Sequence, residues 1–149
     1  GAVGVVTSAT TTSLTVSFIT RPVAGNLTAV VSTNGVVSGP AVQVASVIPV
    51  VSSRNVSLPA DESTVTINGF GFDPVATNNR ITFNNGAVGN VTQATPTSLT
   101  VRFTTRPTTS ADLTAVVTTN SRPSASAVQV ANVVPAVRES SAGVGINAA

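Results

Sequence analysis

The sequence predicts an all-β protein, and three observations support this prediction. Val and Thr, whose β-branched side chains favour a pleated strand over a helix, are frequent throughout the 149 residues. Lys and Met, which are good helix formers, do not occur at all. Short stretches that alternate apolar and polar residues are separated by turn signals such as Asn-Gly, Asp-Pro and Arg-Pro.

The alternating stretches predict a set of short strands in the second half of the chain. Their expected ranges are 64–68, 80–83, 98–103, 113–117 and 127–133. The range 98–103 alternates most clearly and places Leu99, Val101 and Phe103 on one face. Short strands at this spacing, joined by polar turns, predict a β-sandwich.

An internal repeat with a period of about 85 residues organises the chain. GAVGVVTSATTTSLTVSF, which starts at Gly1, matches GAVGNVTQATPTSLTVRF, which starts at Gly86. The motif LTAVV recurs from Leu27 and Leu113, and AVQVA recurs at residues 41–45 and 127–131. This period suits one small β-sandwich per repeat.

One stretch of the complete repeat resembles a known family. Residues 63–72 (STVTINGFGF), followed by ITF at 81–83 and TSLTV at 97–101, resemble an IPT/TIG-type immunoglobulin-like domain of large bacterial surface proteins. Residues 59–62 (PADE) replace the Gly-Gly that usually opens the first core strand of that family. The resemblance implies Ig-like modules that serve in binding or as spacers, and it carries over no catalytic residues. Together with the internal repeat, it predicts tandem Ig-like β-sandwich repeats.

The repeat divides the chain into three expected parts. Residues 1–48 are the later strands of a first Ig-like repeat that is incomplete in this chain, and residues 49–135 form a complete repeat. Residues 136–149 begin a further repeat or form a donor-strand tail, in which Val144 and Ile146 are the candidate donor or subunit-interface residues. In the simpler alternative, the missing strands lie upstream in the same polypeptide.

The composition argues against an enzyme and against a cofactor. There is no His and no Cys, so the usual proton-transfer side chain and the thiolate nucleophile are absent. The five carboxylates are scattered and are interpreted as solvated turn residues. A calcium site at a domain junction, built from Asp73, Asn78 and Asn79, remains open, although no dense Asp-x-Asp pattern supports it.

The charge pattern also argues against nucleic acid and membrane partners. The predicted pI of about 11.2 is high only because all basic residues are Arg, and the formal net charge is just +2. The Arg residues form no dense cluster of the kind that phosphate binding needs. No apolar run is long enough for a membrane-spanning helix.

Three further sets of residues stand out in the sequence. Arg21-Pro22 and Arg106-Pro107 occupy equivalent positions and are interpreted as strand-ending turns, with a contact between neighbouring domains as the alternative. Asn26, Asn55 and Asn90 stand in glycosylation sequons whose use is left open. The expected core anchors are all five aromatic residues: Phe18, Phe70, Phe72, Phe83 and Phe103.

These observations predict a non-enzymatic structural subunit or segment of an extracellular or cell-surface fibre, stalk or array. Its partners would be copies of itself, joined by head-to-tail stacking or strand complementation. The alternatives are an adhesin or receptor-type binding module and an accessory domain of a larger secreted protein. The loops at 35–40 and 121–126, where the two copies diverge, would be the place to look for a ligand.

Overall fold

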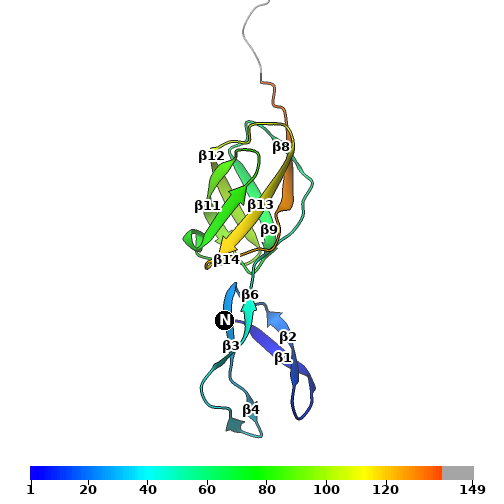
Figure 1. Cartoon of the computed structure of the whole chain (residues 1–149), viewed down its shortest axis with the longest axis vertical. Helices are drawn as coiled ribbons and strands as arrows, with labels where there is room; N and C mark the ends of the chain where they lie inside the picture. The colour runs from blue at the N-terminus through cyan, green and yellow to red at the C-terminus, as the bar shows by residue number, and fades with distance from the viewer. Residues whose placement is uncertain (139–149) are drawn as a thin grey trace, which may run out of the picture.

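The computed structural model describes residues 1–138, which form two units arranged end to end (Figure 1). The N-terminal unit is defined here as residues 1–47 and the C-terminal unit as residues 50–138. The expected donor residues Val144 and Ile146 lie outside the described residues.

The C-terminal unit is an Ig-like β-sandwich of two sheets. One sheet has the order β11-β12-β9-β7, with strands Val88–Thr95, Ser98–Thr105, Thr64–Phe70 and Val50–Val51. The other has the order β10-β13-β15-β8, with strands Asn79–Phe83, Asp112–Thr119, Val128–Val134 and Ser57–Pro59. The short strand β14 (Arg122–Pro123) pairs with β13, and a 3-10 turn, η1 (Ala76–Asn78), precedes β10.

The core of this unit follows from alternation along its strands. Every second residue of β9, β12 and β13 points inward, as expected for a sheet with one buried face. Ile67, Leu99 and Leu113 are completely buried. They pack with other buried side chains that include Val65, Phe72, Val101, Phe103, Ala115, Val117, Val130 and Val133.

The N-terminal unit consists of three two-stranded pairs. They are β1 with β2 (Val3–Ala9 and Leu14–Thr20), β3 with β6 (Gly25–Ala29 and Val42–Val47), and β4 with β5 (Ser32–Thr33 and Val36–Val37). The β1–β2 pair keeps the register of β11–β12, since Gly4 faces Phe18 as Gly89 faces Phe103, and the register shifts directly before Gly4 and directly before Gly89. The hairpin geometry is therefore encoded locally in both copies.

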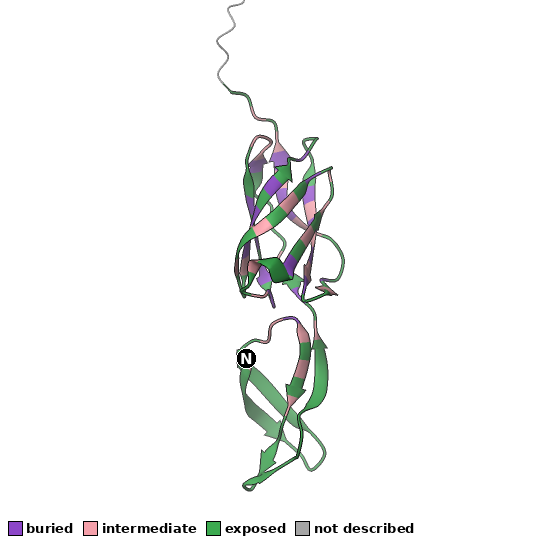
Figure 2. Cartoon of the chain, turned by 90° about the vertical axis from the view of Figure 1, so that its left-hand side faces the viewer, coloured by how far each residue is buried: buried purple, intermediate pink, exposed green. Residues whose placement is uncertain are grey.

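Burial separates the two units sharply, as Figure 2 shows. Leu14, Val16 and Phe18 are 44%, 46% and 45% exposed. Their counterparts Leu99, Val101 and Phe103 are 0%, 0% and 9% exposed. The same apolar face is thus present in both units, but it is covered only in the C-terminal one.

The five aromatic residues do not share one environment. Phe72 and Phe103 lie in the core, and Phe83 is half-buried against it. Phe70 and Phe18 were predicted to be core anchors, and for these two residues the prediction is wrong. Phe70 is 42% exposed because the alternation of β9 points Gly69 inward and Phe70 outward. Phe18 points toward the sandwich face of the N-terminal unit, which no described strand covers.

Candidate functional site

The two units are joined by a very short connection. Only Ile48 and Pro49 separate β6 from β7, and Pro49 is completely buried. Strand β7 then pairs at once with β9, where Val51 lies opposite Gly69. A Cβ on Gly69 would lie 2.0 Å from the carbonyl oxygen of Val50, so only glycine allows this close approach.

A backbone hydrogen bond links the units at the same point. The amide of Ala24, in the turn between β2 and β3, donates to the carbonyl oxygen of Gly71 over 2.9 Å. Ala24 is buried, although most of its unit is exposed. Gly71 has a φ of 79°, which other residues adopt only with strain. The turn after β9 is therefore shaped to receive the turn after β2.

Two side chains of the C-terminal unit complete the joint. Asn120 Nδ2 donates to the carbonyl oxygen of Ala24 and to Asp73 Oδ2, both over 3.0 Å. Arg122 Nη2 donates to Asn26 Oδ1. Asn120 lies in the turn between β13 and β14, and Arg122 begins β14, so this hairpin carries two of the side-chain contacts between the units.

Asp73 is held in its ionised form by these contacts. The backbone amide of Val75 donates to Asp73 Oδ1 over 2.8 Å and is the main cause that lowers the pKa of Asp73. The side chain of Asn120 lowers this pKa further. Buried Asn79 braces the same loop, since its amide donates to the carbonyl oxygens of Asp73 and Val75.

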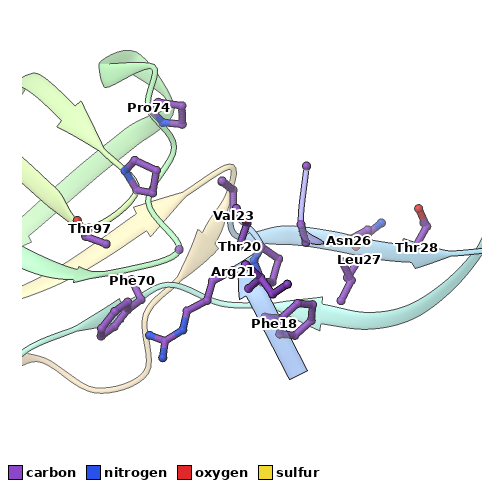
Figure 3. Close-up of a pocket in the computed structure, with 16 residues that line it drawn as sticks. Phe18, Thr20, Arg21, Val23, Asn26, Leu27, Thr28, Phe70, Pro74 and Thr97 are labelled. Carbon is purple, nitrogen blue, oxygen red and sulfur yellow. The ribbon is translucent and has the colours of Figure 1, made fainter. Parts of the chain in front are cut away.

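Arg21 covers Phe70 across the joint. The guanidinium carbon lies 4.4 Å from the centroid of the ring, which is within cation–π range (Figure 3). Beside this pair is an open hollow of about 1190 Å³ lined by both units, including Phe18 and Leu27 on one side and Phe70 and Pro74 on the other. The hollow adjoins the uncovered face of the N-terminal unit.

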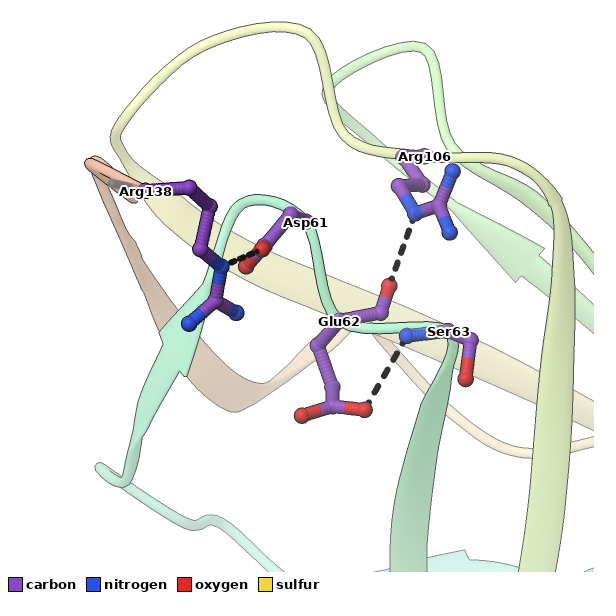
Figure 4. Close-up of polar contacts among 5 residues, drawn as sticks. All are labelled: Asp61, Glu62, Ser63, Arg106 and Arg138. Carbon is purple, nitrogen blue, oxygen red and sulfur yellow. Dashed lines mark hydrogen bonds and ion pairs between the residues drawn. The ribbon is translucent and has the colours of Figure 1, made fainter. Parts of the chain in front are cut away.

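The equivalent arginine makes a different contact at the far end of the C-terminal unit. Arg106 Nε donates to the carbonyl oxygen of Glu62 over 3.2 Å, within its own unit (Figure 4). Arg138 pairs with Asp61 nearby, and this pairing lowers the pKa of Asp61. The sequence left two interpretations open for these arginines, a strand-ending turn or a contact between domains. Arg21 makes the contact between units, whereas Arg106 braces a turn.

The other candidate residues are placed as follows. Asp73 and Asn79 are neighbours, but their oxygens accept hydrogen bonds from the protein itself. Within residues 1–138, no group of three or more His, Cys, Asp or Glu side chains is placed to hold a metal ion. Among the sequon residues, Asn26 lies at the joint and Asn55 is close to Gln129, with Nε2 3.4 Å from Asn55 Oδ1. Asn90 lies exposed on β11.

Sequence reasoning missed most of the joint. Ala24, Gly71 and Asn120 meet only after folding, and none belongs to a recognisable motif. One signal was available in the diverging loops, where Arg122 replaces the Val36 of the first copy. The sequence suggests these loops as the place for a ligand, whereas the structure places Arg122 against Asn26 of the neighbouring unit.

Comparisons with known proteins give one match. The model of the IPT/TIG domain family matches residues 46–132, more than half of the chain, and these residues include most of the C-terminal unit. No curated protein and no solved structure matches. Among the described residues, no helix is long and apolar enough to cross a membrane.

Proposed function

The chain belongs to the IPT/TIG family of immunoglobulin-like domains, and from this premise we propose that it is a non-enzymatic structural segment of an extracellular or cell-surface fibre, stalk or array. The family is one of non-catalytic Ig-like modules that occur in surface proteins. The chain would act by holding successive modules end to end at a fixed spacing, with copies of the same repeat as its neighbours.

The joint is the observation that carries this proposal. A two-residue connection leaves little freedom between the units, because flexible linkers gain their reach from length. The hydrogen bonds of Ala24 and Arg122 resist bending at the joint, and the Arg21–Phe70 contact adds a third point. Three separated contacts restrict rotation as well as bending, as a spacer requires.

The proposal is tested by measuring how narrowly the two units are held. The chain contains no cysteine, so Thr12→Cys and Thr104→Cys would place one spin label on each unit at exposed positions. Pulsed electron spin resonance should give a single narrow distance distribution. The same pair in an Arg21→Ala, Arg122→Ala background should give a clearly broader one. Equally broad distributions in both proteins would overturn the spacer proposal and favour an adhesin or accessory module.

A further inference from the structure

The N-terminal unit has an apolar face, and its strands β2, β3 and β6 each have an edge that is unpaired within residues 1–138. Strand β2 pairs only with β1, and β3 and β6 pair only with each other. The exposed face includes Leu14, Val16, Phe18 and Val44. Exposed edges beside an apolar face favour the addition of further strands.

The C-terminal unit shows what covers each of these features. Strand β9 pairs with β12, the counterpart of β2; β10 pairs with β13, the counterpart of β3; and β8 pairs with β15, the counterpart of β6. All three covering strands lie within residues 50–83, the part of the repeat that has no counterpart in the N-terminal unit. A single segment therefore closes the whole sandwich.

Phe83 and Phe103 show how the covering segment packs against the apolar face in the C-terminal unit. The rings of Phe83 and Phe103 lie 5.6 Å apart, centroid to centroid, in a tilted arrangement. Phe18 is the counterpart of Phe103 and keeps the same register in its hairpin. No aromatic partner for its ring occurs among the described contacts, and it lines the open hollow instead.

We propose that the N-terminal unit binds a further copy of the segment 48–85, in the register that β8, β9 and β10 keep in the C-terminal unit. This deepens the proposed function, because it names the partner that completes the first module. In this proposal the copy is joined covalently ahead of Gly1, as Asn85 is joined to Gly86.

The turn that ends the segment supports a covalent connection. Asn84 clamps this turn to β13, since its Oδ1 accepts from the amide of Thr114 and its Nδ2 donates to the carbonyl oxygen of Asp112. Thr28 occupies the position of Thr114 on β3 and is exposed. A segment that runs directly into Gly1 would bring its own Asn84 to that site.

The test uses the full chain with a copy of residues 48–85 added directly before Gly1. Hydrogen exchange of the amides in β2 is the readout, because exchange reports local opening. Burying Leu14, Val16 and Phe18 should slow this exchange by at least about tenfold relative to the unextended chain. Binding of a hydrophobic dye should fall in parallel.

A matched control separates folding onto the face from mere lengthening of the chain. The control carries Val65→Asp and Ile67→Asp within the added copy only, so the inward face of its β9 cannot pack. No slowing in the extended chain, or equal slowing in both, would overturn the proposal. If exchange of the β2 amides in the unextended chain instead slows as the protein concentration rises, with a doubled mass in solution, a second molecule covers the face. That result would overturn the proposal of a covalently joined copy. These readouts do not depend on the distance between the units, so the spacer proposal can fail separately.

Discussion

Asn120 donates a hydrogen bond to the carbonyl oxygen of Ala24, and this contact joins the tip of one β-turn to the neighbouring unit. Asn120 has a φ of 50°, and so does Asn34, its counterpart in the N-terminal unit. Asparagine tolerates this left-handed conformation better than most residues. The same residue type thus serves the turn in both copies and serves the joint in only one.

This relationship gives a matched pair of variants. Asn120→Ala and Asn34→Ala should each strain their turn by about 1–2 kcal/mol, because alanine resists the left-handed conformation. Only Asn120→Ala should broaden the distance distribution between spin labels on the two units. An equal broadening in both variants would show that turn strain, and not the lost contact, loosens the joint.

Leucine truncation should distinguish the two copies of the hairpin. Leu99→Ala should lower the free energy of unfolding of the C-terminal unit by about 2–5 kcal/mol, because the side chain is completely buried. Leu14→Ala should change the free energy of unfolding of the N-terminal unit by less than about 0.5 kcal/mol, since the side chain of Leu14 is 44% exposed. Urea denaturation measures both. A large loss for Leu14→Ala would mean that the N-terminal face is already covered.

Gly69→Ala should weaken the attachment of β7. The new methyl group would approach Val50 O and the ring of Phe72, 2.5 Å away, so the strands must move apart. We expect a loss of about 1–3 kcal/mol, as for other overpacked sites, measured by thermal or urea unfolding. Gly1→Ala is the control, because a Cβ there would meet nothing within 4 Å. Unchanged stability of Gly69→Ala would contradict the close β7–β9 pairing.

Acid should loosen the joint through Asp73. Its pKa in the folded protein is lowered below 3.8, chiefly by the amide of Val75 and also by Asn120. A lowered pKa means that the ionised carboxylate stabilises the fold above the unfolded-state value, and that this contribution is lost as the pH falls through the folded-state value. The distance distribution should therefore broaden below a pH of about 4. Asp73→Asn should broaden it at neutral pH and flatten the pH response; a variant that retains the full acid response would point to another carboxylate.

Local pattern was enough to predict the sandwich but not every side-chain position. The alternation in 98–103 correctly placed Leu99, Val101 and Phe103 inward. Phe70 was assigned to the core by its residue type, although the phase of Val65 and Ile67 already pointed it outward. The same alternation in the first hairpin predicts an inward Phe18, but periodicity along one strand cannot reveal whether another strand covers it.

The joint could not be predicted because its residues are distant in the sequence. The side-chain amide of Asn120 bonds to the backbone carbonyl of Ala24, and no sequence motif or spacing identifies either group. The sequence suggests a contact between domains for Arg21, but it assigns Phe70, the ring that Arg21 covers, to the core. Contacts of this kind depend on how two turns approach each other, which repeat alignment does not describe.

The pairing of β8 with β15 has a mechanical consequence. These strands are parallel, with Ser57 opposite Asn132 and Pro59 opposite Val134. The chain enters the C-terminal unit at the joint and leaves it at the opposite end, after β15 (orange in Figure 1). Once β7 is detached from β9, tension along the long axis would slide β8 and β15 past each other and load their hydrogen bonds together, whereas peeling a hairpin breaks such bonds one after another.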